Sequence, residues 1–159
     1  MIDVIDNFLP PKKFYLLQEM FFSKTFPWFW GGEKVRGTDN FNNWQMSHNF
    51  YQYSIPYSNQ DISSVIETLK PNAIHKIKAN LTFYTPQIYE YGLHTDVEDF
   101  ECTTAVYYLN TNDGYTIFED GSKVDSVANR IVKFPSYMNH SGTTCTNEKR
   151  RIVLNLNYF

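Results

Sequence analysis

The chain has 159 residues, a length that is typical of one domain with a substantial hydrophobic core. Its 14 basic and 17 acidic residues leave a net charge of −3, which argues against a nucleic-acid partner. No stretch is apolar for the length of a membrane span, and the first residues lack the pattern of a signal peptide, so we expect no membrane partner. Cys102 and Cys145 form no C-x-x-C pair, and we expect reduced thiols in a cytoplasmic protein. Nothing in the sequence indicates an oligomeric state.

The N-terminal part predicts one short strand and two helices. Residues Ile2 to Phe8 have the composition of a strand. Apolar residues recur at helical spacing from Pro11 to Ser23, directly after a Pro-Pro pair that suits a first helical turn. A second helix is predicted to run to Leu69, with Ser58 or Asn59 as its N-cap.

An aromatic segment, Phe26 to Asn49, separates the two helices. It holds Trp28, Trp30 and Trp44 but has no clear period, so we interpret it as strands joined by loops that cover one end of the fold. Two interpretations of its aromatic residues, Phe26 to Trp44, stay open. They line a substrate entrance, or they are core residues under a long loop.

From Ala73 onward the apolar period changes to two, which is typical of strands. The predicted strands are Ala73–Tyr84, Tyr89–His94, Thr103–Leu109, Tyr115–Phe118, Lys123–Val124, Arg130–Phe134 and Arg150–Tyr158. This order predicts a mainly β protein with flanking helices (α+β), folded as a double-stranded β-helix, or jelly roll. We expect a single domain over residues 1–159, with helices and aromatic cover in about 1–72 and the jelly-roll core in about 73–159.

Two histidines and one carboxylate are the candidate metal ligands. His94 and Asp96 are two positions apart, so on an extended chain their side chains share a face. A facing strand of a jelly roll would bring His140 to the same point. Two histidines and a carboxylate on one face are the ligand set of non-haem Fe(II) oxygenases. An H-x-D pair alone is weak evidence, because most such pairs lie on protein surfaces.

The last predicted strand, Arg150–Tyr158, adds a candidate carboxylate-binding residue to the candidate metal ligands. Arg151 shares one face with Val153, Asn155 and Asn157, whereas the Leu/Ile residues between them share the other face. The apolar face suits a layer of helices, so the Arg/Asn face would point into the barrel. An arginine there can hold a carboxylate through two parallel hydrogen bonds. Arg150 lies on the opposite face. The competing interpretation is a half-exposed edge strand with its polar face in water.

With these residues in place, the sequence resembles the Fe(II)- and 2-oxoglutarate-dependent dioxygenases, near their prolyl 4-hydroxylase-like, small single-domain branch. The resemblance covers roughly half of the chain, from about Ala79 to Phe159. It is carried by the segments YGLHTDVEDF, TTAVYYLNTNDGYTIFEDG and ANRIVKFPSYMNHSGTTCTNEKRRIVLNLNYF. One departure is Gly114-Tyr115-Thr116-Ile117-Phe118, since the family usually has two glycines before its Thr-x-Phe element.

The resemblance implies roles for named residues. His94, Asp96 and His140 would bind Fe(II), and Arg151 would hold the distal carboxylate of 2-oxoglutarate. Tyr84 fits a family position near the same carboxylate, Asn80 is a second candidate, and Asn155 or Asn157 would line the same pocket. His48 and His75, the remaining histidines, are interpreted as structural or surface residues, and His48 is the better placed of the two to face a substrate.

The implied function is hydroxylation of a substrate C–H bond with O2 and 2-oxoglutarate as co-substrates and release of succinate and CO2. The substrate is a small molecule, a peptide or a protein, and a prolyl or other protein side chain is one candidate. Two alternatives remain: a jelly-roll binding or structural protein without turnover, and a cupin-type metal enzyme that does not use 2-oxoglutarate. Arg151 distinguishes the last alternative, because a cupin has no need for a carboxylate-binding arginine there.

Overall fold

The computed structural model describes residues 1–33 and 44–159. Its helices are α1 (Pro11–Phe22) and α2 (Ser63–Leu69). Its strands are β1 (Asp3–Ile5), β2 (Phe29–Glu33), β3 (Trp44–Gln52), β4 (Ile55–Pro56), β5 (Ile74–Phe83), β6 (Thr103–Tyr108), β7 (Tyr115–Phe118), β8 (Lys123–Asp125), β9 (Ile131–Pro135), β10 (His140–Gly142) and β11 (Arg150–Tyr158). Among these described residues, no helix is both long and apolar enough to cross a membrane.

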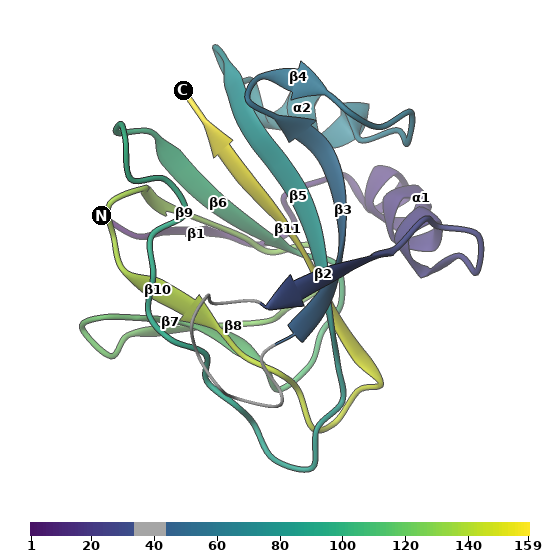
Figure 1. Cartoon of the computed structure of the whole chain (residues 1–159). Coiled ribbons are helices and arrows are strands. Elements are labelled where there is room, and N and C mark those ends of the chain that lie inside the picture. The colour runs from purple at the N-terminus through teal and green to yellow at the C-terminus, as the bar shows by residue number, and fades with distance from the viewer. Residues whose placement is uncertain (34–43) are drawn as a thin grey trace.

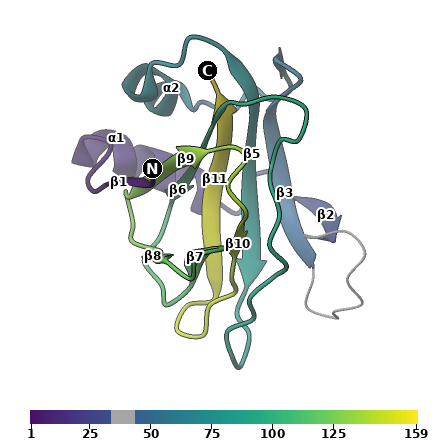
Figure 2. The same ribbon diagram turned by 90° about the vertical axis from the view of Figure 1, so that its left-hand side faces the viewer.

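The strands form two antiparallel sheets. The large sheet has eight strands in the order β1-β9-β6-β11-β5-β3-β2, with β4 paired to β3. The small sheet has the order β10-β7-β8. Figure 1 shows α1 and α2 on one side of the large sheet and β7, β8 and β10 on the other. In the turned view, β11, β5 and β3 run side by side along the molecule (Figure 2). The predicted jelly roll with outer helices is therefore confirmed.

The two faces of β11 explain the layers. Ile152, Leu154 and Leu156 lie in the larger apolar cluster, which also contains Leu17 and Phe21 of α1. The intervening residues face the small sheet, where Val153 packs in a second apolar cluster. Because β11 lies between β5 and β6, the edge-strand interpretation is wrong. The burial of its apolar face against the helices turns its polar face toward the inside of the barrel.

Helix α1 offers a matched test of this packing. Leu17 is 5% exposed and belongs to the cluster between the helices and the large sheet, whereas its neighbour Leu16 is 57% exposed. We expect Leu17→Ala to lower the free energy of unfolding by about 2–5 kcal/mol, because it removes buried methyl groups and leaves a cavity. Leu16→Ala should cost less than about 0.5 kcal/mol. Chemical denaturation of both variants measures the difference, and equal losses would contradict the assigned packing.

The start of α2 differs from the prediction. The helix begins at Ser63, whose backbone N–H donates to Asp61 Oδ1 at 2.8 Å. The Ser58 hydroxyl lies 2.7 Å from His48 Nε2 and accepts from the Gln60 backbone N–H, so a tertiary contact and a local turn use the oxygen that was expected to cap the helix. Both predicted caps, Ser58 and Asn59, are therefore wrong.

The first 72 residues contribute strands as well as cover. Strand β1 forms one end of the large sheet, next to β9. Strands β3 and β2 form the other end, next to β5, so both ends of the sheet come from the N-terminal part. Phe26 is buried and Trp28 packs against the same apolar cluster, which supports the core interpretation for these two residues. Trp30 is 67% exposed and stacks on Trp44 at 5.0 Å between ring centroids. The rest of the aromatic segment, residues 34–43, lies outside the described residues.

Candidate metal and cofactor site

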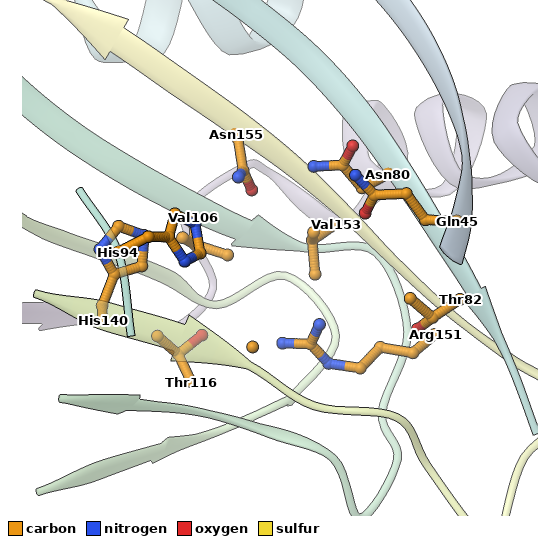
Figure 3. Close-up of a pocket in the computed structure, with 11 residues that line it drawn as sticks. Gln45, Asn80, Thr82, His94, Val106, Thr116, His140, Arg151, Val153 and Asn155 are labelled. Atoms are coloured by element: carbon orange, nitrogen blue, oxygen red, sulfur yellow. The ribbon is translucent and has the colours of Figure 1, made fainter. Parts of the chain in front are cut away.

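The three candidate ligands come from two neighbouring chain segments. His140 opens β10, and His94 lies in the connection between β5 and β6. The expected strand Tyr89–His94 is reduced to single bridges, of which the one at His94 pairs with His140. Each of these two histidines donates its backbone N–H to the carbonyl of the other at 3.0 Å. This antiparallel pair brings the imidazoles together, with ring centroids 5.0 Å apart (Figure 3).

Asp96 completes the group. Its Oδ1 lies 3.7 Å from His94 Nε2, and its Oδ2 lies 3.8 Å from His140 Nε2. One ligand atom from each of the three residues lies within 4.8 Å of the other two. This spacing suits three bonds to one ion. The structure therefore brings together the three residues that the sequence nominated.

Backbone carbonyls set the ring nitrogen that each histidine presents. His94 Nδ1 lies 3.1 Å from the Gly92 carbonyl, and His140 Nδ1 lies 3.1 Å from the Met138 carbonyl. A carbonyl oxygen only accepts, so each neutral ring donates from Nδ1 and carries its lone pair on Nε2. Outer contacts of this kind orient histidine ligands in metal sites. Two imidazole nitrogens and one carboxylate fit Fe(II) and leave further coordination positions open.

Arg151 is a deeply buried cationic residue of the interior. It is 3% exposed, its Nε donates to Ser126 Oγ at 2.8 Å, and its guanidinium carbon lies 5.6 Å from the centroid of the Tyr108 ring. Among the described residues, no carboxylate forms an ion pair with it. Burial lowers the pKa of Arg151, while the neighbouring Tyr108 and Tyr91 oppose the shift. A buried cation without a carboxylate partner among the described residues is a candidate binding site for an acidic ligand.

A narrow cavity joins Arg151 to the histidines (Figure 3). It is lined by Gln45, Asn80, Thr82, His94, Val106, Thr116, His140, Gly142, Arg151, Val153 and Asn155. The cavity volume is about 40 Å³, so we expect the lining side chains to adjust when a dicarboxylate binds. Small side-chain adjustments of this kind are common when a ligand binds.

Unpaired polar atoms surround the same space. Among the described residues, buried side-chain oxygens without a hydrogen-bond partner include Oε1 of Gln45, Oδ1 of Asn80 and of Asn155, and Oγ1 of Thr82. All four of these side chains line the narrow cavity, and Asp96 Oδ2 has no partner either. Buried polar atoms are nearly always paired with protein, water or ligand. The residues present therefore fit a polar ligand between the metal ligands and Arg151.

The expectation for Tyr84 is not supported. Tyr84 is 53% exposed, lies one residue beyond the end of β5, and lines a surface hollow with Thr146 to Lys149. Thr82, two residues earlier, takes the interior position and pairs with Arg151 across the two strands. Asn80 and Asn155 line the cavity as expected, and Asn157 lies farther along the same face.

Other interior residues were missed by sequence reasoning. Thr82 could have been predicted from its spacing, because it lies two residues after Asn80 and so shares a face with it on a strand. Gln45, Ser126 and Tyr91 had no readable signal, because only the pairing of distant strands brings them inside. Tyr91 is buried, and desolvation raises its pKa to about 12 although the charge of Arg151 opposes the shift.

We expect substitutions of Thr82, on β5, and of Tyr84, just beyond its end, to have different effects on 2-oxoglutarate binding. Thr82→Val removes a buried hydroxyl beside Arg151 and should weaken binding of 2-oxoglutarate by roughly tenfold, the value of one hydrogen bond to a charged group. Tyr84→Phe should change the dissociation constant by less than about twofold, because an exposed phenol far from the cavity contributes no such hydrogen bond. Calorimetric titration with 2-oxoglutarate separates the two, and a larger effect at Tyr84 would restore its expected role.

Close packing explains why position 114, two residues before Thr116, is a glycine. A Cβ at this position would lie 2.6 Å from the Thr144 carbonyl oxygen and 2.8 Å from Arg151 Cδ. These distances are shorter than real Cβ contacts, so only glycine lets Arg151 lie where it does. The position where the family has its second glycine holds Tyr115, whose hydroxyl donates to the exposed Glu90 at 2.5 Å. The departure from the family pattern thus leaves β7 intact.

The remaining histidines lie away from the site. His48 Nδ1 contacts the Pro27 carbonyl at 2.8 Å, and its ring packs against Phe26 and Phe50 in the aromatic cluster of the outer core. His75 packs edge-on against Phe100 at 4.8 Å between centroids. Both have the structural roles that were expected, and the described contacts give His48 no position facing the cavity.

Solved structures with the same fold include a collagen prolyl hydroxylase of Paramecium bursaria Chlorella virus-1, in its 2-oxoglutarate complex. It is 16% identical, with a TM-score of 0.64 over 98% of this chain and 94% of that chain. The chain has the fold of the 2-oxoglutarate–Fe(II) oxygenases. A 2-oxoglutarate–Fe(II) oxygenase family protein from Burkholderia pseudomallei is 10% identical, with a TM-score of 0.69 over 99% of this chain and 84% of that one.

A prolyl hydroxylase from Trichoplax adhaerens, solved with a peptide fragment of the hypoxia inducible factor oxygen degradation domain, shares this oxygenase fold. It is 16% identical, with a TM-score of 0.64 over 99% of this chain and 83% of that one. No protein-family model and no curated protein sequence matches the chain. The likeness therefore establishes the oxygenase fold, and activity has to be argued from the residues of the site.

Proposed function

We propose that this chain is an Fe(II)- and 2-oxoglutarate-dependent dioxygenase that hydroxylates a C–H bond of its substrate and releases succinate and CO2. The observation that carries the proposal is the pairing of two features in one interior. A two-histidine, one-carboxylate group lies at one end of a narrow cavity, and a buried arginine without a carboxylate partner among the described residues lies at the other end. Metal and a dicarboxylate are the ligands that complete these two ends.

Each residue has a definite task in this proposal. His94, Asp96 and His140 would hold Fe(II), which when bound supplies the redox chemistry that couples O2 and 2-oxoglutarate to substrate oxidation. Arg151 would hold the distal carboxylate of 2-oxoglutarate, with its fork oriented by Ser126. Asn80, Thr82 and Asn155 offer polar atoms along the cavity between them. Arg151, Asn80 and Thr82 are buried, and low exposure to water strengthens charged contacts.

The two alternatives are less well supported. A binding protein without turnover has no need for a complete ligand group whose histidines are each oriented by a backbone carbonyl. A cupin-type enzyme that does not use 2-oxoglutarate has no need for a desolvated Arg151, whose burial costs free energy unless an acid binds. We further propose one domain over residues 1–159 and a cytoplasmic location, which is compatible with the free thiols of Cys102 and Cys145.

The substrate is open to two classes. The Trichoplax neighbour was solved with a peptide fragment, so a prolyl or other protein side chain is one candidate. A small molecule is the other candidate, and the chemistry of the cavity mouth bears on the choice.

Release of labelled CO2 from 2-oxoglutarate tests the function. Purified protein with Fe(II) and O2 should form succinate and CO2 in equal amounts, slowly without substrate and faster with it. His140→Ala should abolish the reaction, and omission of Fe(II) should do the same. If the wild type forms no succinate above the level of His140→Ala with any substrate offered, the protein is not a dioxygenase of this kind.

A further inference from the structure

A second, wider cavity opens beside the metal ligands on the side away from Arg151. It holds about 410 Å³ and shares Gln45, Asn80, His94 and Asn155 with the narrow one. We call it the lysine pocket. The described residues that line it are Gln45, Lys76, Lys78, Asn80, His94, Thr95, Asp96, Glu98, Asn155 and Asn157. Every one of these side chains is polar or charged, whereas small-molecule sites are usually lined mainly by apolar residues.

Two lysines give the pocket its charge. Lys76 and Lys78 lie two residues apart on β5, so both side chains point to the interior face that also carries Asn80. Among the described residues, no carboxylate lies within ion-pair distance of either amine. Burial lowers the pKa of Lys78 and repulsion from Lys76 adds to the shift, while Asp96 opposes it. Two half-buried, like charges without a counter-ion are costly unless an anion joins them.

The register between β5 and β11 shows where the two lysines lie relative to Arg151, the residue proposed to hold 2-oxoglutarate. Across β5 and β11, Thr82 pairs with Arg151 and Lys78 pairs with Asn155. The four residue-to-residue steps from Thr82 to Lys78 span about 13 Å along an extended strand. His94 lines both cavities, so the metal ligands lie between the arginine end and the lysine end. A molecule in the lysine pocket would therefore reach the metal from the side that 2-oxoglutarate does not occupy.

We propose that the lysine pocket binds the acidic group of a small, polar substrate, with Lys78 and Lys76 as its cationic partners. This inference rests on the proposed dioxygenase function and narrows its substrate class. Among the described residues the lining is entirely polar or charged, which offers no apolar contact to a prolyl ring or another apolar peptide side chain. Glu98 lies at the exposed rim, where a carboxylate suits an ammonium group. A zwitterion such as a free amino acid therefore matches both charges.

Calorimetric titration of the protein loaded with Mn(II) and 2-oxoglutarate, without oxygen, tests this inference. The probes are free L-amino acids, their carboxamides as uncharged counterparts, phosphoethanolamine, and capped peptides that contain proline or aspartate. Lys78→Gln and Lys76→Gln are compared with Lys12→Gln, which changes an exposed lysine of α1. We expect at least one acid probe to bind, its carboxamide to bind at least about tenfold more weakly, and Lys78→Gln to reduce affinity by roughly tenfold to a hundredfold. Lys12→Gln should leave affinity unchanged.

The set of probes that bind either identifies the acidic group of the substrate or refutes the inference. Binding of an amino acid identifies a carboxylate as the acidic group, and binding of phosphoethanolamine alone identifies a phosphate. If no acid probe binds, if carboxamides bind as well as acids, if Lys78→Gln has no effect, or if only the capped peptides bind, the inference is wrong. Failure to bind 2-oxoglutarate at all would instead refute the proposed function. In that case the same titration of metal-free protein still tests the lysines.

Discussion

Replacing Arg151 with glutamine should weaken binding of 2-oxoglutarate by at least about a hundredfold, equivalent to roughly 3 kcal/mol. The guanidinium is 3% exposed and, among the described residues, has no carboxylate partner, so its charge is available to an incoming acid. The variant also loses the planar fork that makes two parallel hydrogen bonds to a carboxylate. Arg151→Lys keeps the charge but loses the fork, so it should recover only part of the affinity.

Arg150 provides the matched control for this prediction. Its guanidinium carbon lies 4.4 Å above the Phe22 ring on the outer face of β11, against α1. Arg150→Gln should therefore change the 2-oxoglutarate dissociation constant by less than about threefold, although loss of the cation–π contact can cost about 0.5–1 kcal/mol of stability. Calorimetric titration of both variants gives the comparison. Equal losses would show that the faces of β11 are assigned wrongly.

Removal of Asp96 is the second change with a large expected effect. Asp96→Ala should lower Fe(II) affinity by at least about a hundredfold, because even loss of an outer contact of a metal ligand costs 10–100-fold. Asp99→Ala, three residues along and exposed, is the control and should bind Fe(II) like the wild type. Equilibrium dialysis against Fe(II) without oxygen measures both affinities.

The stability of the metal-free Asp96→Ala protein supplies an independent check. Asp96 Oδ2 is buried and, within residues 1–33 and 44–159, has no hydrogen-bond partner, so the carboxylate costs free energy until a cation joins it. The melting temperature of the metal-free variant should equal or exceed that of the metal-free wild type. A clear drop would mean that Asp96 has a structural role in the fold, and loss of metal would then not assign it as a ligand.

Local periodicity was sufficient for the C-terminal strand. Alternation along Arg150–Tyr158 predicted which residues would meet the helices and which would face the barrel, and both faces are as expected. On β5, where the sequence also predicted a period of two, Lys76, Lys78 and Asn80 share one face. What alternation cannot give is the partner of each face, because burial is decided by strands that are distant in sequence.

The errors arise where a local rule met a tertiary constraint. Period two would put Tyr84 on the face of Thr82, but β5 ends at Phe83 and the Tyr84 side chain is 53% exposed. Ser58 has the composition of a helix cap, yet its hydroxyl contacts His48. Strand β3 contributes Gln45 to both cavities, and the aromatic segment that contains it was expected to hold strands, but without a clear period the inward-facing residues could not be predicted.

One spectrum tests the proposed cofactor site most directly. When Fe(II) and 2-oxoglutarate are added to the purified protein without oxygen, the wild type should develop the weak visible charge-transfer band of an iron–2-oxoglutarate chelate. His94→Ala should show no band and should bind metal more weakly. If the wild type develops no band and His94→Ala binds metal as well as the wild type does, the dioxygenase proposal is wrong.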